Sequence, residues 1–591
     1  MAGQIGKTVN IKGNIKIKVY FLAAILLIII LQIRHINELY GPWVNDDEIG
    51  YWGTAAFFAG YNWSGVLKYS AYYSYGYGIL IAPLFLIFKN PTTLYRSAVC
   101  LNIIFLLLVF LIAYIIVRQI YNELEKEISI LIALIATLTS GAVTYAEIAW
   151  SETAILLFTW LTLFLFWEYL KRRNLLFLVL FTLCNLGIYI IHQRMLGIVI
   201  ASSIILIFCV LYKKIPANHI LLYITLLIVG IVIASVLKTY IQDVLWNYGE
   251  SSSLISNLNV NDYEGQIGKI ALIFSSPNNF LLFIENVLGK IFYFNFASFF
   301  TLFICLYFFF KKIIKKQISN EVIFYLFALL SIAGMIAITS IFNFNPGRND
   351  GLIYGRYSES LVGITILIGF ANCLCSREKK MVSIPILIFL FSPFLEVLLA
   401  YMVKHLMWIG ENAVFTLNIP AMSRYIVLEE QTFYIAKFLI ESIAILCVIL
   451  FIIYFYQKNT KLRNIVLSAL FIILLFTSYA NETCVYREHI SFWQAQKKEV
   501  ISLIQSSENI ISNRENIYFL MQDEFNLDGN RNIIQYTLRD KEIECISEDL
   551  LPEMKEGDLI FINISNPLYE DVKDQFILVK ENSVLGLFIS D

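Results

Sequence analysis

The feature that most constrains this chain of 591 residues is a series of long apolar runs. A helix needs about 20 mostly apolar residues to cross the hydrocarbon core of a bilayer, and runs of this kind recur along most of the chain. They are centred near Ala24, Val109, Ile135, Thr159, Leu180, Ile204, Val229, Leu302, Leu330, Ile366, Phe389, Val448 and Ile472. The sequence therefore predicts an all-α polytopic membrane protein with about 13 transmembrane helices. A shorter run, Gly78 to Phe88, predicts a helix that lies at the interface or re-enters.

The composition supports lipid as the solvent of this chain. Hydrophobic residues make up 58% of the sequence and charged residues only 15%, whereas soluble domains carry about 25% charged residues. The formal net charge is −1. Without an excess of basic residues there is no electrostatic argument for a nucleic-acid partner.

Basic residues in the short loops predict the orientation of the chain. Clusters precede the first apolar run and recur at 171–173, 213–214, 311–316, 377–380 and 457–463. If the helices alternate in direction, all of these clusters fall on one side, which is then cytoplasmic. We expect the protein in the plasma membrane, with its N-terminus in the cytoplasm. An odd number of spans places the C-terminus outside. A long first outer loop, 37–95, and a second long loop near 242–290 lie on the outer side.

The composition changes after about residue 480. The segment "EHISFWQAQKKEVISLIQ" has the pattern of an amphipathic helix, and "NIYFL", "EIECI" and "DLIFINI" are typical of short buried strands. We expect a transmembrane domain over 1–480 and a small extracytoplasmic α/β domain over 481–591. Cys484 and Cys545 either form a disulfide, if the compartment is oxidising, or remain two thiols.

Three consecutive acids follow the first apolar run in "NDDEIGYWGTAAFFAG". One acid at a helix start is explained by capping, because a side-chain oxygen satisfies the unpaired N–H groups there. Capping does not explain Asp46, Asp47 and Glu48 together between aromatic residues. Asp47 and Tyr51 are four residues apart, so a helix places them on one face. We interpret this segment as a candidate site at the membrane surface.

Further polar residues are expected on the same face. "AEIAWSET" carries Trp150 and Glu152 in a short loop, where an interfacial tryptophan and a helix cap are the alternative interpretation. "IIHQRMLG" places His192 and Arg194 at a turn between two apolar runs. An arginine there either snorkels to water or has a functional partner.

The loop "NPGRNDGLIYGRYSES" contains Arg348, Tyr354, Arg356 and Tyr357 just before an apolar run. A guanidinium offers a forked, permanently charged set of donors that matches phosphate oxygens, and a tyrosine hydroxyl adds another donor. The pattern indicates a receptor for a lipid phosphate, with an aromatic belt and structural ion pairs as the alternative.

Taken in order, these segments resemble the polytopic GT-C glycosyltransferases, which include protein O-mannosyltransferases and the bacterial aminoarabinose transferase. The resemblance is carried by "DEIGY", "SYGYGILIAPLFLIF", "LYRSAVCLNIIFLLL", "WSETAILLF" and "HQRMLG", and it covers about the first 215 residues. The "YGRYSE" loop resembles bacterial members. The C-terminal domain matches no partner domain of the family.

The resemblance implies a sugar donor linked to polyprenyl phosphate and an acceptor hydroxyl outside the cytoplasm, on a cell-envelope glycan, lipid or protein. It implies Asp47 as the general base of an inverting transfer. Beside that role we expect Glu48 either to act on the site through its neighbours or to orient the acceptor, and Glu152 to be a supporting acid. The expected phosphate ligands are Arg356, Arg194, Tyr357, Arg348 and His192, and the expected lining of the sugar and acceptor pocket is Asp46, Tyr51, Tyr354 and Trp150.

Three alternatives stay open from the sequence. A flippase or transporter for a lipid-linked sugar, a ligase or polymerase of whole oligosaccharides, and a non-catalytic scaffold would each use a similar bundle. Some GT-C members use a divalent metal, for which Asp46, Asp47 and Glu152 offer oxygen ligands. We expect no cofactor and no essential metal.

Overall fold

The computed structural model describes residues 11–246, 263–315, 318–346, 351–375, 416–427, 432–458, 463–522 and 529–590. The longer helices are α1 (Ile11–Ile33), α2 (Asn45–Phe58), α4 (Gly76–Ile87), α5 (Pro91–Ile120), α6 (Lys126–Thr137), α8 (Glu152–Arg172), α9 (Leu175–Ile191), α10 (Leu196–Leu211), α11 (Ala217–Leu245), α13 (Tyr263–Ile273), α14 (Pro277–Ala297), α15 (Thr301–Ile314), α16 (Asn320–Phe342), α17 (Glu359–Cys375), α19 (Ile435–Lys458), α20 (Arg463–Val485), α21 (Ser491–Ser506) and α23 (Gly529–Thr537). Short helical turns lie at α3 (Ser64–Leu67), α7 (Ser140–Tyr145), α22 (Glu508–Ile511) and α24 (Tyr569–Gln575).

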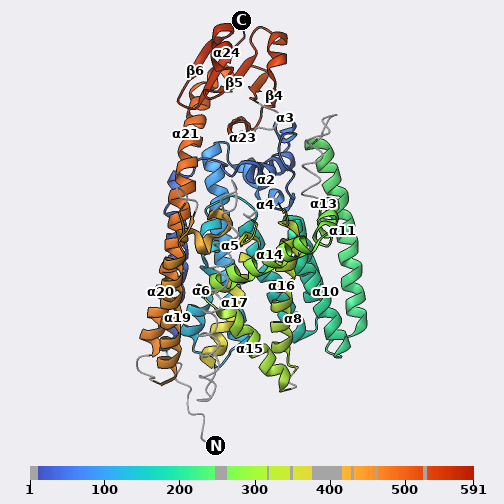
Figure 1. Cartoon of the computed structure of the whole chain (residues 1–591), viewed down its shortest axis with the longest axis vertical. Helices are drawn as coiled ribbons and strands as arrows, with labels where there is room; N and C mark the ends of the chain where they lie inside the picture. The colour runs from blue at the N-terminus through green and yellow to red at the C-terminus, as the bar shows by residue number, and fades with distance from the viewer. Residues whose placement is uncertain are drawn as a thin grey trace, which may run out of the picture.

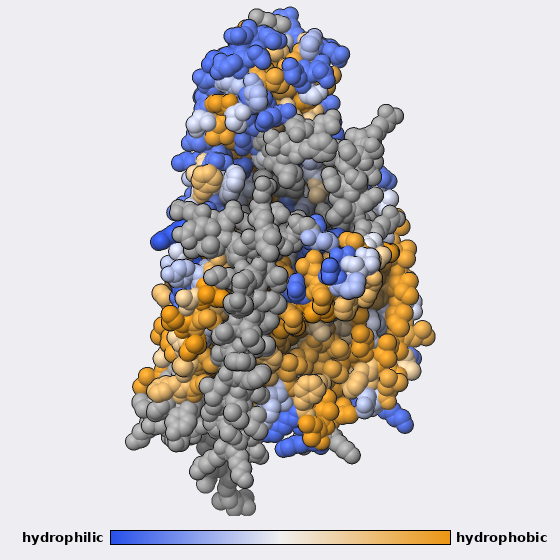
Figure 2. Space-filling view, viewed as in Figure 1, coloured by the Kyte–Doolittle hydropathy of each residue, from blue (hydrophilic) through white to orange (hydrophobic). Residues whose placement is uncertain are grey.

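The helices form a bundle with a band of apolar surface around it. Figure 2 shows this band over the bundle and a mostly hydrophilic C-terminal domain beyond one end of it. Along α11, the side chains of Ile228, Val232 and Val236 are all more than half exposed. Such a surface is stable only against acyl chains, so the chain is a multi-pass membrane protein.

Nine helices within the described ranges are long and apolar enough to cross a membrane. The predicted helices around Ile135 and Leu302 exist, but α6 has 12 residues and α15 has 14, which is short for a span. The run around Phe389 lies outside the described residues. The apolar segment Gly78 to Phe88 forms the short helix α4, as expected for a segment too short to cross.

The second long outer loop was predicted wrongly in part. Its C-terminal portion is the helix α14, which is long and apolar enough to span. The helix is interrupted after α14 because Phe299 and Phe300 both adopt positive φ angles, 53° and 62°. Bulky residues rarely take this conformation, so the hydropathy pattern around Leu302 gave no sign of the break.

Two helices of the bundle approach each other through glycine. A Cβ atom on Gly197 of α10 would lie 2.6 Å from the backbone carbon of Gly334 on α16. Small residues let transmembrane helices pack backbone to backbone, and this contact fixes the segment that begins α10.

The C-terminal domain contains a five-stranded mixed sheet with the order β4-β3-β5-β7-β6. Its strands are β3 (Ile517–Leu520), β4 (Ile543–Ile546), β5 (Leu559–Asn563), β6 (Ile577–Glu581) and β7 (Leu585–Ile589); a two-stranded ribbon, β1 (Ile426–Val427) and β2 (Thr432–Phe433), lies between α17 and α19 in the chain. β3 runs parallel to β4 and β5, while β7 runs antiparallel to β5 and β6. The three predicted strands are present. The last two strands, β6 ("ILVKE") and β7 ("LGLFI"), were not predicted from the sequence.

A continuous helical rod joins the bundle to this domain. α20 passes through a π-helical segment, Tyr486–Ile490, directly into α21, so that helix extends across residue 480 (Figure 1). Cys484 lies on α20, where its Sγ donates to Glu488 Oε1 at 3.0 Å, and Cys545 lies on β4. The structure does not join these two cysteines by a disulfide.

The C-terminal domain also binds the first outer loop through hydrogen bonds. Arg539 donates to the carbonyl oxygens of Phe85 and Phe88 at 3.1 and 2.6 Å. Tyr536 donates to the carbonyl of Pro91, and Arg531 to that of Tyr69. Figure 1 shows α23 of this domain directly over α2, the helix that carries the acids. The domain therefore holds the candidate site in place from above the bundle.

Candidate active site

Three segments far apart in the sequence converge at the end of the bundle nearest the C-terminal domain. They are the first turn of α2, the start of α8 and the 3₁₀ turn Arg356–Ser358 (η3) before α17. Arg356 is 5% exposed and lies between two carboxylates. Its Nη1 donates to Asp47 Oδ2 at 2.5 Å, and its Nε donates to Glu152 Oε1. The sequence predicted all three residues, and the structure brings them together.

Trp150 supports the guanidinium of Arg356 from one side. The Cζ atom of Arg356 lies 3.8 Å from the centre of the Trp150 ring. This cation–π contact shields the ion pairs from water and fixes the plane of the guanidinium. Trp150 thus forms a wall beside the ion pairs of Arg356.

Asp47 is held ionised by its neighbours. Burial alone would raise its pKa, but Arg356 and a hydrogen bond from the hydroxyl of Tyr73 hold the pKa of Asp47 below its usual range. The sequence analysis missed Tyr73, which follows α3 in the first outer loop. Its spacing from Asp47 gave no signal, because only the fold of that loop brings the two together.

Glu48 contacts the backbone, not Arg356. Its Oε2 accepts from the N–H groups of Trp43 and Val44 at 2.8 Å, and its Oε1 accepts from the hydroxyl of Tyr95 at 2.8 Å. Burial raises the pKa of Glu48 to about 7 against these hydrogen bonds. Both oxygens are therefore engaged in holding the approach to α2, the pattern of a helix cap.

A short hydrogen-bonded chain links Tyr51 to Glu152. The Tyr51 hydroxyl and Ser151 Oγ lie 2.8 Å apart, and Ser151 Oγ donates to Glu152 Oε2 at 3.4 Å. Tyr51 is fully buried on the same helix as Asp47. The expected face of α2 therefore turns toward α8, and its contact with Glu152 runs through Ser151.

Arg194 lies beside this cluster with a different set of contacts. Its Cζ stacks 4.3 Å from the ring centre of Tyr357 and 5.4 Å from that of Phe342. Its positive charge also acts to lower the pKa of Asp47. Within the described ranges no carboxylate forms an ion pair with Arg194. Its guanidinium is the cation of the site that is open to a further anion.

His192 is a neutral donor in this arrangement. Burial, together with Arg194 and Arg356, holds the pKa of His192 well below its usual value. Its Nδ1 accepts from the backbone N–H of Arg194 at 3.3 Å, so the ring proton belongs on Nε2. Nε2 is buried and has no hydrogen-bond partner among the described residues. Its ring lies 5.6 Å from that of Tyr357.

Tyr354 and Tyr357 complete this side of the site. Their rings stack with centroids 4.8 Å apart, and the Tyr354 hydroxyl donates to that of Tyr357 at 3.3 Å. Arg348 lies outside the described residues, and the structure places Asp46 in the first turn of α2 without describing its side chain. The metal set considered from the sequence has a guanidinium between two of its members, Asp47 and Glu152.

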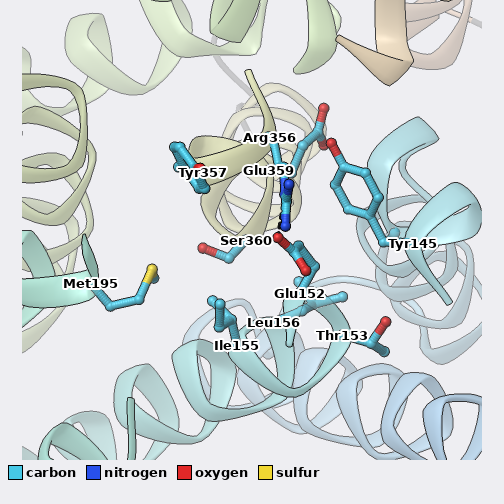
Figure 3. Close-up of a pocket in the computed structure, with 11 residues that line it drawn as sticks. Tyr145, Glu152, Thr153, Ile155, Leu156, Met195, Arg356, Tyr357, Glu359 and Ser360 are labelled. Carbon is cyan, nitrogen blue, oxygen red and sulfur yellow. Dashed lines mark hydrogen bonds and ion pairs between the residues drawn. The ribbon is translucent and has the colours of Figure 1, made fainter. Parts of the chain in front are cut away.

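A small cavity of about 20 Å³, room for roughly one water molecule, lies behind the Arg356–Glu152 pair. Figure 3 shows the guanidinium of Arg356 pointing at the carboxylate of Glu152, with Tyr357 and Met195 on one side and Tyr145 on the other. Its lining combines apolar side chains such as Ile155 and Leu156 with polar ones, among them Thr153, Glu359 and Ser360. Polar and apolar groups therefore meet in this small cavity beside the Arg356–Glu152 pair.

One face of α14 positions the loop that carries Arg356, which the sequence did not reveal. Lys290 is fully buried and donates to the carbonyl of Gly351 at 2.9 Å. A Cβ on Gly289 would lie 2.4 Å from the carbonyl oxygen of Leu352, so that position needs glycine. The apolar pattern of α14 hides this role, because a single lysine within it resembles a snorkelling residue.

Comparisons with known proteins show which fold this is. The sequence matches no protein-family model and no curated protein. The structure is similar to that of apo ArnT from Cupriavidus metallidurans, with a TM-score of 0.52 at 10% identity over 97% of this chain and 98% of that one. The same protein bound to undecaprenyl phosphate gives a TM-score of 0.50 at 9% identity over 96% and 97%. The oligosaccharyltransferase AglB from Archaeoglobus fulgidus, in complex with an inhibitory peptide and a dolichol-phosphate, gives a TM-score of 0.40 at 9% identity over 93% and 70%.

The fold is therefore that of the ArnT structures, a helical membrane bundle with a small domain at its C-terminal end. ArnT, the aminoarabinose transferase, shares it along nearly the whole of both chains. This likeness confirms the fold expected from the ordered segments of the first 215 residues. It extends that expectation to the C-terminal end of the chain, where the sequence had matched no partner domain.

Proposed function

We propose that this chain is a membrane glycosyltransferase that moves a sugar from a polyprenyl-phosphate donor to an acceptor hydroxyl on the extracytoplasmic face. The observation that carries the proposal is the pairing of Asp47 with Arg356 beside a second guanidinium, Arg194, that has no ion-pair partner among the described residues. A carboxylate and a cluster of cations are the two elements that such a transfer needs. The two similar ArnT structures support the donor class, since one of them contains bound undecaprenyl phosphate.

In the proposed reaction the acceptor hydroxyl attacks the anomeric carbon from the face opposite the phosphate and inverts it. The bond from carbon to the phosphate oxygen breaks as the new glycosidic bond forms. Asp47 takes the hydroxyl proton late in the step. Arg194, Arg356 and the Nε2–H of His192 stabilise the negative charge that grows on the leaving phosphate.

The geometry adds a coupling between donor and base. With Arg356 on Asp47, the carboxylate is a weak base, because its pKa is held low. A bound phosphate competes for the same guanidinium. When Arg356 turns toward the phosphate, Asp47 loses its counter-charge and becomes more basic. Glu152 keeps hold of the Nε side of Arg356 during this exchange and limits its movement.

The orientation of the protein in the membrane is part of the same proposal. Lys171 and Arg172 end α8 and Lys311 and Lys312 end α15, so these basic residues lie at the opposite ends of helices from the site. By the distribution of basic residues that end is cytoplasmic. The site and the C-terminal domain then lie on the extracytoplasmic face of the plasma membrane.

Mass spectrometry of lipid that co-purifies with the full chain tests the donor class. We expect a polyprenyl phosphate or its sugar-linked form, reduced by at least about tenfold in Arg194→Ala because a guanidinium–phosphate contact is lost. Arg487→Ala removes an exposed guanidinium elsewhere and serves as the matched control. Lipid retention unchanged by Arg194→Ala would refute its role as a phosphate ligand.

Transfer is tested separately, with a radiolabelled polyprenyl-phosphate sugar and membranes that contain the protein. Label that moves into a non-lipid or second-lipid acceptor supports the enzyme. Label that only crosses the bilayer, with no new glycosidic product, supports a flippase and overturns the proposal. Movement of a whole oligosaccharide block would indicate a ligase.

A further inference from the structure

A second cluster of buried ionisable groups lies apart from the Asp47–Arg356 pair. It is formed by His35 after α1, Glu147 in the loop before α8, and Glu482 on α20. One potential ligand atom from each of these three residues lies within 4.8 Å of those of the other two. Both glutamates are buried. The cluster joins three segments that are more than a hundred residues apart in the chain.

The carboxylates of this cluster outnumber the cation that contacts them. Arg34 Nη2 contacts Glu482 Oε2 and lies 3.6 Å from Glu147 Oε1. This leaves Glu482 Oε1 and Glu147 Oε2 buried, with no hydrogen-bond partner among the described residues. Nearby, Glu38 accepts from the hydroxyl of Tyr486 and adds a further acid to the region. Burying carboxylate oxygens without partners is costly, and a bound ion is one common reason for finding them.

The donor set fits a specific class of ion. We infer that His35, Glu147 and Glu482 bind one divalent transition-metal ion, with Zn²⁺ the best match. An imidazole nitrogen with two carboxylate oxygens suits Zn²⁺, whereas Mg²⁺ and Ca²⁺ prefer oxygen alone. Bonds of about 2.1 Å in a tetrahedral site put ligand atoms about 3.5 Å apart, which small side-chain rotations reach from the distances in this structure.

The surroundings hold the ligands in suitable orientations. The His35 ring stacks on Tyr486 with centroids 3.6 Å apart and an interplanar angle of 18°. Arg34 has other interactions to keep when the ion is bound, since its Nη1 donates to the Leu31 carbonyl at 2.5 Å and its Cζ lies 4.8 Å from the Tyr479 ring centre. The ion takes the oxygens that Arg34 leaves without a partner.

Such an ion would brace the proposed active site without taking part in transfer. Glu147 lies three residues before Trp150 and five before Glu152, both of which contact Arg356. Glu482 lies on the rod that continues into α21 and the C-terminal domain. The ion would tie the end of α1, the loop that carries Trp150 and this rod into one unit.

Metal analysis of the full chain tests this inference. The protein is purified with an affinity tag that contains no histidine and without added chelator, and its metals are measured by inductively coupled plasma mass spectrometry. We expect about one equivalent of Zn²⁺ per chain, as for a single structural site. We expect His35→Ala and Glu482→Gln to fall to less than a fifth of that content, and Glu441→Gln, an acid paired with Arg424 elsewhere, to keep it.

Thermal unfolding gives a second readout that does not depend on the variants. Removing the metal from the wild type with a chelator should lower Tm, and Zn²⁺ should restore it while Mg²⁺ does not. A wild type without bound Zn²⁺ whose Tm is insensitive to both ions would overturn the inference, leaving Arg34 as the counter-ion. Full metal content in both ligand variants would also overturn it. Neither readout involves sugar transfer, so the outcome is independent of the proposed function.

Discussion

Replacing Arg356 by methionine gives the sharpest test of how the site is built. Methionine fills much of the same volume but leaves Asp47 and Glu152 without the guanidinium that both contact. Breaking a buried ion pair by removing one partner destabilises a protein by about 3–5 kcal/mol. The unfolding entropy is about 2.1 cal/mol/K per residue, so a chain of this length loses roughly 2–4 °C of Tm for that change.

The pH dependence of this variant separates charge from packing. In the wild type the pKa of Asp47 is depressed, so its contribution to stability is present above the unfolded value of about 3.9 and is lost as pH falls below it. Without Arg356, burial acts unopposed by this partner and raises the pKa of Asp47 above the unfolded value. Its contribution is then present at low pH and is lost as pH rises.

Tm measured in detergent between pH 5 and pH 8 checks the sign of this effect. We expect the deficit of Arg356→Met relative to wild type to grow with pH, and to shrink when Asp47→Asn is added to the same chain. A deficit that is constant across this range would show that the lost free energy comes from packing against Trp150. That result would refute the electrostatic account of the site.

Three further changes test individual residues. Asp47→Asn should lower kcat by about 10²–10⁴-fold, the usual contribution of a general base, without reducing co-purified lipid, because Arg356 stays free to bind phosphate. Near-normal turnover would exclude Asp47 as the base. Glu48→Gln should flatten the fall in Tm between about pH 4.3 and pH 7, because its raised pKa makes the stability contribution of Glu48 decline as pH rises through that window; an unchanged slope would contradict this. Gly289→Ala should lower kcat/KM by about 100-fold. The added Cβ would lie 2.4 Å from the carbonyl oxygen of Leu352 and displace the loop that carries Arg356. Gly268→Ala on α13, where a Cβ meets nothing within 4 Å, is the matched control and should leave activity within about twofold; equal effects of the two glycine variants would refute the positioning role of α14.

Much of the site was predictable because its residues are polar exceptions in an apolar sequence. Asp47, Glu152 and Arg356 stand out in segments that hydropathy places at helix ends, and the order of basic loops put them on one face. The chemistry of a carboxylate facing a guanidinium then followed from residue type alone. Glu48 shows the limit of this reasoning, since a helix cap and a reacting acid have the same local sequence.

The residues that hold the site were not predictable in the same way. Tyr73 reaches Asp47 only when the first outer loop folds. Lys290 reaches the carbonyl of Gly351 only when α14 packs against the loop that carries Arg356. The break at Phe299 and Phe300 depends on two unfavourable backbone conformations that the surrounding packing imposes. Periodicity reports which face of a helix is apolar, and it carries no information about where one helix ends inside an apolar stretch.

The hydrogen bonds between the C-terminal domain and the first outer loop affect which positions of this fold can change during evolution. Arg531, Tyr536 and Arg539 all donate to main-chain carbonyls of the loop, at Tyr69, Pro91, Phe85 and Phe88. A carbonyl is the same whatever side chain its residue carries. Selection can therefore replace the loop's side chains freely while the docking survives, provided the three donors and the path of the loop persist. Divergence should therefore change the side chains at these four acceptor positions before it changes the three donors.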